Sequence, residues 1–329
     1  VTDRVARLRF QVGRALRPGA MEGVRAARLV NDAHRELEVL HELVAAPVLE
    51  HLDEVSRLVV VPHGCLHLVP FHALRERSAD GASQHVLDRY EVVVAPSAGV
   101  YVHAARRGGP DHVTGGTDHG GAAVIGVGDE AAPLIAEEAR AIAKRLDADD
   151  LLLGSRATVE RVANAIRGRR VVHFACHGRF SSTAPLSSGL MMADRWMTVR
   201  DMIGLRLEAD LVTLSGCETG CNLVAGGDEL LGLLRGFLAA GAGSIVASLW
   251  TTSDRTTASL MERFYDALLD TSSGSGLEHA EPFAGGSFGS VRGRSPLRPA
   301  AALRRAQLAL RDERPHPAFW APFIVTGAS

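Results

Sequence analysis

The chain has 329 residues, of which 46% are hydrophobic and 22% charged, which is enough for one large domain or two small ones with a real core. Its formal net charge of −2 and its pI of about 6.7 provide no basic field for nucleic acid or an anionic membrane surface. Four cysteines make no disulfide framework, and no apolar run reaches the roughly 20 residues of a membrane-spanning helix. We therefore expect a cytoplasmic protein in a reducing compartment, with neither nucleic acid nor membrane as a partner.

The first 56 residues are predicted to form helices that pack on the domain that follows. Leu29, Ala33, Leu37 and Leu40 recur at the spacing of one helix face. Pro47 is expected to break this run, with a shorter helix continuing to residue 54. Residues 57–61 (RLVVV) are the first predicted strand, so we place the main domain at residues 57–329.

The main domain alternates apolar runs with amphipathic segments. Apart from two runs treated below, strands are predicted at residues 90–95, 122–127, 151–153, 190–193, 244–249 and 322–326. A short helix is predicted to end at residue 107 and another to begin at residues 198–201. Further helices are predicted at residues 134–146, 158–167 (capped by Thr158), 229–240, 255–269 (capped by Ser253 or Asp254) and 300–311. Residues 271–299 are rich in Gly, Ser, Pro and Arg and are predicted to be a flexible insertion. This alternation predicts an α/β sheet covered by helices on both faces.

Two buried-strand patterns end on reactive residue types beside glycine. Residues 170–178 (RVVHFACHG) lead to His177, and residues 210–220 (DLVTLSGCETG) lead to Cys217. The carboxyl edge of a parallel sheet is where open α/β folds place their sites, and adjacent strands would bring the two side chains together there. A neutral imidazole can take the proton of a thiol, whose thiolate is the nucleophile. The backbone N–H groups of Gly178 and Cys217 could then point at a developing oxyanion.

Other cysteine chemistry fits less well. A nucleophile elbow would need Gly at position 215, where this chain has Ser215, and would need its histidine after the nucleophile. His173 shares a strand face with His177 but lies four residues back from the edge, so we expect it to be structural. Cys176 points to the opposite face and is expected to pack in the core.

Neither a metal nor a nucleotide cofactor is expected. A zinc site from Cys176, His177, Cys217 and Cys221 would lack the usual C-x2-C pair. The spacing of three histidines, at positions 63, 67 and 72, fits no zinc motif. Residues 126–128 (GVG) follow a predicted strand, but the full G-x-G-x-x-G pattern of a phosphate loop is missing.

Several separate motifs, in order along the chain, resemble those of CHAT-domain peptidases, which are bacterial caspase-like cysteine proteases related to separase. They occur at residues 59–74 (VVVPHGCLHLVPFHAL), 90–99 (YEVVVAPSAG), 171–178 (VVHFACHG), 210–220 (DLVTLSGCETG), 226–250 (GGDELLGLLRGFLAAGAGSIVASLW) and 302–311 (ALRRAQLALR). The resemblance implies a caspase-like three-layer sandwich with a mostly parallel central sheet. It also implies a cysteine endopeptidase with His177 as general base, Cys217 as nucleophile, and the N–H groups of Gly178 and Cys217 as oxyanion hole.

The resemblance adds an expectation about the substrate, a protein or peptide. Separase-like relatives use an Asp near the position of Asp254 to hold a basic P1 side chain, so cleavage after Arg, and less readily Lys, is expected. Asp254 could equally cap the helix before Arg255, and the two roles are compatible. Asp228, at the end of the loop after Cys217, is a candidate for a supporting role near the substrate. The alternative is that it caps and charges the start of its helix.

The resemblance also raises the question of regulation. CHAT domains usually follow tetratricopeptide-type helical repeats, and residues 1–56 are too few for such an array. We therefore expect an upstream repeat domain or a separate partner to regulate activity. The alternative is a caspase-like signalling or scaffold module that acts by binding without turnover, and the presence of both His177 and Cys217 argues against it.

Overall fold

The computed structural model describes residues 1–77, 83–107, 120–130, 132–179, 184–205, 207–215, 228–250, 253–270 and 298–327. The segment with Cys217 and Cys221, most of the Gly-rich stretch at residues 108–121, and residues 271–297 of the predicted insertion lie outside these ranges.

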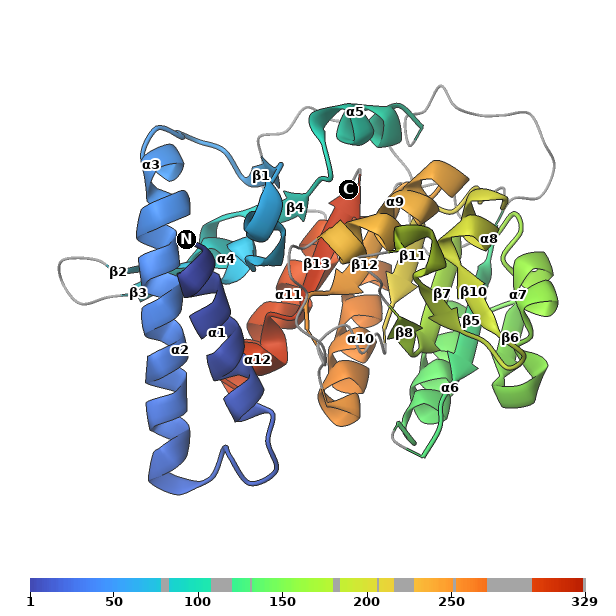
Figure 1. Ribbon diagram of the computed structural model, residues 1–329, viewed down its shortest axis with the longest axis horizontal. Helices are drawn as coiled ribbons and strands as arrows, with labels where there is room; N and C mark the ends of the chain where they lie inside the picture. Colours follow the sequence, from blue (N-terminus) through green and yellow to red (C-terminus); the bar gives the residue numbers. More distant parts are fainter. Residues whose placement is uncertain are drawn as a thin grey trace.

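An eight-stranded sheet forms the centre of the molecule, in the order β1-β4-β13-β12-β11-β7-β5-β6 (Figure 1). Its strands are β1 (Arg57–Val60), β4 (Glu91–Val94), β5 (Ala122–Val127), β6 (Asp150–Leu153), β7 (Val171–Cys176), β11 (Leu211–Leu214), β12 (Ser244–Ser248) and β13 (Phe323–Gly327). All neighbours pair in parallel except β12 and β13, which are antiparallel. The sheet thus consists of two opposed parallel blocks, and β12, β11, β7, β5 and β6 end at one common edge.

Helices cover both faces of this sheet, as the alternating sequence pattern predicts (Figure 1). Three long helices pack side by side on one face: α6 (Ile135–Leu146), α10 (Asp254–Leu269) and α11 (Pro299–Glu313). The other face carries α9 (Asp228–Ala240) with α8 (Val199–Ile203) beside it, and the remaining helices of this region are α5 (Ala98–Arg107), which lies against β13, and α7 (Val159–Ala165). Thr158 and Thr198 cap α7 and α8 through their side chains, which confirms the predicted Thr158 cap and the short helix predicted to open at Thr198.

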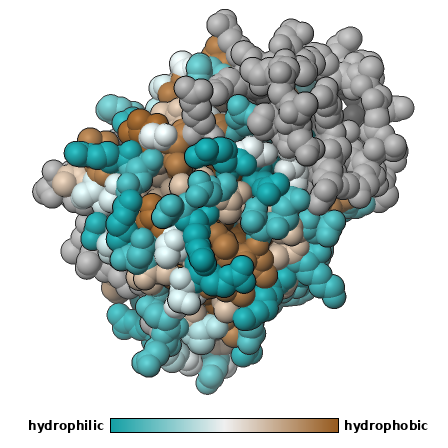
Figure 2. Space-filling model, turned by 90° about the vertical axis from the view of Figure 1, so that its right-hand side faces the viewer, coloured by the Kyte–Doolittle hydropathy of each residue, from teal (hydrophilic) through white to brown (hydrophobic). Residues whose placement is uncertain are grey.

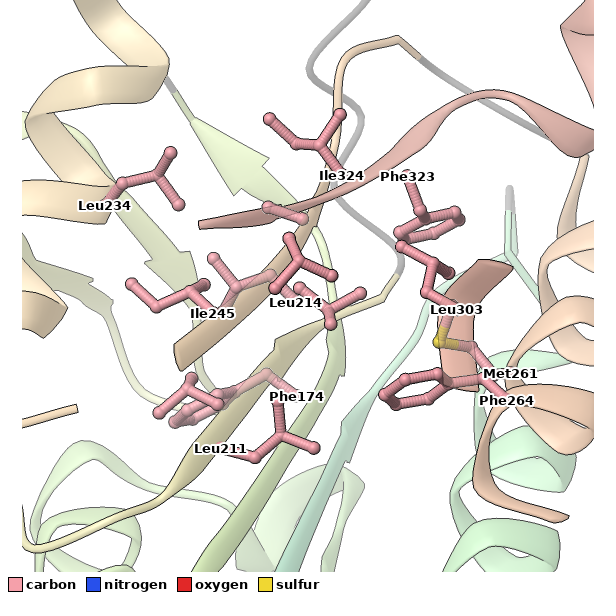
Figure 3. Close-up of a cluster of buried hydrophobic side chains, with 14 of the residues drawn as sticks. Phe174, Leu211, Leu214, Leu234, Ile245, Met261, Phe264, Leu303, Phe323 and Ile324 are labelled. Carbon is pink, nitrogen blue, oxygen red and sulfur yellow. The ribbon is translucent and has the colours of Figure 1, made fainter. Parts of the chain in front are cut away.

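The core lies on both sides of the sheet, because successive residues of a strand point to opposite faces. On the α9 face, Phe174 of β7 packs on Phe237, with 5.7 Å between the ring centroids. Phe323 and Ile324, adjacent in β13, point to opposite sides, with Phe323 on the side that also holds Phe264 of α10 (Figure 3). All these side chains are buried.

The glycines at residues 126 and 128 have a packing role. A Cβ atom on Gly126 would lie 2.8 Å from the Cβ of Ala139 in α6, and one on Gly128 would lie 2.8 Å from the carbonyl oxygen of Ala132. Because neither backbone nor short side chains can yield easily, only glycine lets α6 approach β5 this closely. This close approach of α6 accounts for the G-x-G sequence after a strand, so no nucleotide site is needed to explain it.

The N-terminal segment forms a pair of helices, α1 (Thr2–Ala15) and α2 (Gly23–Val44), followed by the short α3 (Ala46–Leu49) (Figure 1). The helical run breaks just before Pro47 and a short helix follows, as predicted. The long helix ends at Val44, and Pro47 lies in the first turn of α3, where its missing N–H costs no hydrogen bond. The short helix stops at Leu49, not at residue 54.

Several small elements were not predicted. They are the hairpin β2 (Arg75–Arg77) with β3 (Ser83–His85), the 3-10 turns η1 (Gly64–Leu68) and η2 (Phe71–Ala73), the helices α4 (Val86–Arg89) and α12 (Pro317–Trp320), and a three-stranded sheet of β8 (Gly178–Arg179), β9 (Gly189–Met191) and β10 (Trp196–Thr198). The predicted strand at residues 190–193 is therefore β9, displaced by one to two residues. Among the described residues, no helix is both long and apolar enough to cross a membrane.

Four buried or half-buried histidines join the N-terminal helices to the main domain. His34 of α2 lies 5.5 Å from His85 between ring centroids, and His85 lies 5.1 Å from Trp320 of α12. His72 contacts the same tryptophan, at 6.3 Å. His316, at the start of α12, accepts a hydrogen bond from the N–H of Ala318 through Nδ1. Two faces that each carry neutral imidazoles therefore meet where α2 docks on α12.

Burial keeps these histidines neutral. Desolvation lowers the pKa of His34 and of His72 to about 3, and that of His85 and of His316 to about 4. The unfolded chain protonates its histidines near pH 6.5. Between these pH values the unfolded state binds protons that the folded state does not bind, so stability is greatest above pH 6.5 and falls as the pH is lowered.

His316→Asn tests this linkage, because Asn keeps a side-chain acceptor for the helix cap but does not titrate. We measure the free energy of unfolding by urea denaturation from about pH 7.5 to about pH 4.5. Below about pH 6.5, its decrease per pH unit should be smaller in the variant than in the unmodified chain, by about 1.4 kcal/mol. His51→Asn is the control, because the side chain of His51 is 77% exposed, and it should keep the slope of the unmodified chain. Equal slopes for His316→Asn and the unmodified chain would contradict the account.

Candidate functional site

His177 lies directly after β7, at the edge where five parallel strands end. Its side chain is buried, with 9% of its surface exposed. The β7 side chains alternate as the sequence predicts: His173 contacts Tyr265 of α10, and Phe174 contacts Phe237 of α9. Since it is four residues from His173, His177 belongs to the α6/α10 face. The imidazole is therefore mostly shielded from solvent, although it lies at the edge of the sheet.

Asp129 lies against this histidine and was missed by sequence reasoning. Its Oδ1 atom is 3.1 Å from Nε2 of His177, and its side chain is 51% exposed. The contact arises because β5 is the neighbour of β7, with Asp129 two residues after the end of β5 and His177 one residue after the end of β7. The signal was available in the sequence, since Asp129 comes after a buried run that ends at residue 127. The order of the strands was needed to recognise it.

The backbone at His177 is fixed by the small sheet β8-β9-β10. The N–H of Met191 donates to the carbonyl of His177 over 2.8 Å, and Gly178 pairs with Leu190 of β9. In an antiparallel ladder, hydrogen-bonded residues alternate with residues whose N–H and C=O point the other way. The N–H of Gly178 is therefore directed away from β9, which is the orientation that an oxyanion-hole donor would need.

The second predicted residue, Cys217, lies outside the described residues, so its contact with His177 remains a prediction. What the structure does describe is the strand that leads to it. β11 pairs with β7 in parallel, with Thr213 opposite His173, and the N–H of Ser215 donates to the carbonyl of Phe174 over 2.8 Å. The two strands are therefore neighbours up to Ser215, two residues before Cys217.

The two predicted substrate-binding carboxylates open helices. Ser253 is the N-cap of α10, and Asp254 is its first residue and half-buried. Because α10 follows β12 and packs beside α6, Asp254 begins on the same edge and face of the sheet as His177. Asp228 is the first residue of α9. Neither carboxylate has a described contact with His177, and their proposed roles are untested.

Several other candidate residues of the sequence are buried. Cys176 is 1% exposed and packs in the hydrophobic core, and His173 is fully buried, both as expected. His72 belongs to the histidine cluster, and His67 lies in η1. In the described ranges, no group of three or more His, Cys, Asp or Glu side chains could hold a metal ion.

The overall architecture is that of caspase-like proteins, in which helices cover both faces of a mostly parallel sheet. A solved separase–securin complex of Saccharomyces cerevisiae matches with a TM-score of 0.54 and 12% identity, over 95% of this chain and 20% of that one. The Arg-specific cysteine proteinase gingipain R matches with a TM-score of 0.54 and 11% identity, over 99% of this chain and 74% of that one. At such low identity, the likeness shows the shared fold.

The sequence identifies the family more directly. Residues 34–328 match the model of the CHAT domain, and the chain belongs to the CHAT domain family. Tetratricopeptide repeat protein 28 of mouse is 26% identical over 89% of this chain, and its human counterpart is also 26% identical over 89%. The chain spans 13% of the length of each of these relatives. The family match begins inside α2, so it includes part of the segment that we expected to precede the main domain.

Proposed function

We propose that the chain is a cysteine endopeptidase that uses His177 as general base and Cys217 as nucleophile. The observation that supports this most strongly is the pairing of β7 with β11. Every paired residue of β11 is numbered 40 above its partner in β7, as for Thr213 and His173. Cys217 has the same offset from His177, so continuing this register beyond Ser215 would bring a thiol and an imidazole to the same level.

The proposed reaction has two halves. His177 takes the thiol proton, the thiolate attacks the scissile carbonyl, and His177 then gives the proton to the leaving amine, which leaves an acyl-enzyme. His177 next takes a proton from water, the hydroxide attacks the thioester, and the regenerated thiolate recovers the proton. In both halves the N–H groups of Gly178 and Cys217 would stabilise the oxyanion, which fits the direction of the Gly178 N–H.

Asp129 gives the imidazole a fixed orientation in this proposal. Its contact at Nε2 leaves the other ring nitrogen, Nδ1, as the atom that we assign to the thiol. A carboxylate on the far side of the ring also favours the imidazolium that forms when the thiol is deprotonated. The site would then work as a Cys217–His177 dyad supported by Asp129.

We propose substrates with a basic P1 residue, Arg before Lys, with Asp254 as the acidic group of the pocket. Asp254 begins α10 at the edge that carries His177, so a substrate held there would lie near both. The structural neighbour gingipain R is named as Arg-specific, a property of that protein that agrees with this proposal. Asp228, which opens α9 after the Cys217 segment, is proposed in a supporting role at the same pocket.

We also propose that a partner or an upstream repeat region regulates this activity. One structural neighbour was solved as a complex of separase with securin, and the curated relatives are tetratricopeptide repeat proteins far longer than this chain. Because a regulated peptidase can be inactive alone, activity tests should include candidate activators. A module that acts only by binding would lack a reactive Cys217.

Cys217→Ala is the direct test of the nucleophile. With a peptide library that contains Arg and Lys, we expect the unmodified chain to cleave after these residues and the variant to lose at least about 10⁴-fold in rate. The melting temperature should stay the same, which separates loss of chemistry from loss of fold. Cys65→Ala is the matched control, because Cys65 lies in η1, outside the proposed site, and it should cleave normally. Retained cleavage in Cys217→Ala would exclude this residue as the nucleophile.

Asp129→Asn should lower kcat by about tenfold or more with little change in KM, because an amide neither favours the imidazolium nor fixes the ring in the same way. Steady-state kinetics on the best Arg peptide measure the effect. Asp266→Asn is a suitable control, since Asp266 is also exposed (62%) and paired with an arginine, Arg145, on the sheet face. An Asp129→Asn enzyme with normal kcat would show that the contact in the structure has no catalytic consequence.

Asp254→Asn tests the specificity. We expect kcat/KM for an Arg peptide to fall by about 30-fold, or about 2 kcal/mol, while the rate with the matching Gln peptide stays unchanged. If Asp254 serves only the helix dipole, the variant should instead lose about 0.3–1 kcal/mol of stability and keep its preference for Arg. Thermal unfolding and peptide kinetics together distinguish the two roles.

A further inference from the structure

A chain of five buried polar side chains lies beneath the proposed site, on the α6/α10 face of the sheet. Its members come from four elements: Glu138 from α6, His173 from β7, Thr213 and Ser215 at the end of β11, and Tyr265 from α10. Glu138 is 4% exposed and the other four are fully buried. Polar groups are placed so deep only when each finds a partner.

The contacts run continuously from β11 to α6 and back. The hydroxyl of Ser215 donates to Oε1 of Glu138, and Nε2 of His173 lies 3.2 Å from the same oxygen. On the other side of the ring, Nδ1 of His173 lies 3.2 Å from the hydroxyl oxygen of Tyr265. Tyr265 in turn donates to Oγ1 of Thr213 over 2.9 Å. Glu138 is thus the acceptor that ties the last described residue of β11 to α6.

Tyr265 lies between His173 and Thr213 in this chain of contacts. Burial raises the pKa of Tyr265, so its hydroxyl keeps the proton that it donates to Thr213. Nδ1 of His173 is then the donor in its contact with the tyrosine oxygen. On the other side of the ring, Nε2 of His173 faces Oε1 of Glu138.

The four elements have one more property in common. Each leads to, or begins beside, a residue of the proposed site at the same edge of the sheet: β7 leads to His177, β11 to Cys217, Asp129 precedes α6, and α10 starts at Asp254. Figure 1 shows α6 and α10 lying together with β7 and β11. A shift of any one element relative to the others would displace one site residue relative to the rest.

We propose that Glu138 is a positioning residue for the peptidase site, acting through Ser215 on the strand that leads to Cys217 and through His173 on the strand that leads to His177. This inference rests on the function proposed above. Apolar side chains at this junction would stabilise the fold at least as well, because buried charged groups gain little net stability over hydrophobic ones. Stability alone therefore does not account for the polar network. Directional hydrogen bonds add what apolar packing does not, namely a fixed register between α6, β7 and β11.

Four variants test the proposal. Ser215→Ala removes only the link to β11, and Glu138→Ala removes both links. In Glu138→Gln, an amide nitrogen at the place of Oε1 can donate both to Nε2 of a neutral His173 and to Oγ of Ser215, so the links survive. Ile142→Val is the matched control, because Ile142 is fully buried one turn further along α6 and loses packing but no hydrogen bond.

Two measurements are made on each variant. The first is the rate at which iodoacetamide alkylates Cys217, relative to Cys65, followed by mass spectrometry of the digested protein. The second is kcat and KM on the best Arg peptide. We expect Ser215→Ala and Glu138→Ala to lower both the alkylation rate and kcat by about tenfold to a hundredfold with little change in KM. Glu138→Gln and Ile142→Val should stay close to the unmodified chain.

The outcomes separate this inference from the proposed function. If Cys217 is reactive and cleavage occurs, but Ser215→Ala behaves like Ile142→Val, the network is structural only and the inference is wrong. If Cys217 of the unmodified chain reacts no faster than Cys65 and no peptide is cleaved even with activators, the proposed function fails and the inference falls with it. Should Glu138→Ala fail to fold, Ser215→Ala still decides, because it removes a single oxygen.

Discussion

The parallel pairing of β7 with β11 is the constraint on which the rest of the site depends. Hydrogen bonds between the two strands continue to Ser215, so they fix the level at which each chain leaves the sheet. If the register of β7 against its neighbours shifted by one residue, His177 would point toward the opposite face of the sheet and away from Asp129. The register is secured from both faces, by Phe174 against α9 and by His173 against α10. The same packing that forms the core therefore sets the geometry of the site.

Two clusters of buried titratable groups meet the cost of burial differently. At the junction of the N-terminal helices, four histidines stay uncharged, which makes that junction sensitive to acid. Beneath the site, Glu138 and His173 instead lie 3.2 Å apart within one chain of polar contacts. The first arrangement holds a helix pair against the domain, and the second joins elements of the sheet.

The surface at the β6 end of the molecule is mainly hydrophilic with hydrophobic residues interspersed (Figure 2).

The sequence predicts the local features of the fold well, because they depend on neighbouring residues. The continuous apolar run at residues 122–127 gave β5 with the right bounds, and a threonine before a polar turn identified both capped helices. The contacts of Asp129 and Glu138 could not be inferred, since they require the order of β5, β7 and β11 in the sheet. The bounds of the short helix at Pro47 were not predicted, because a proline is compatible with the first turn of a helix and the sequence alone does not say where that turn begins. The antiparallel pairing of β13 leaves no local signal either, because any buried strand has the same apolar pattern.

That one antiparallel pairing divides the molecule into two functional halves. β1, β4 and β13 run opposite to the other five strands, so their carboxyl ends lie at the edge away from His177. All the proposed site residues consequently come from the block between residues 122 and 270, whereas the N-terminal helices pack on β2 and α12, beside the other block. In the described part of the chain the two blocks meet where β13 pairs with β12 and where α10 packs on α11 and α12. Since α10 also carries Tyr265 and begins at Asp254, it is an element that connects the two blocks beneath the proposed site.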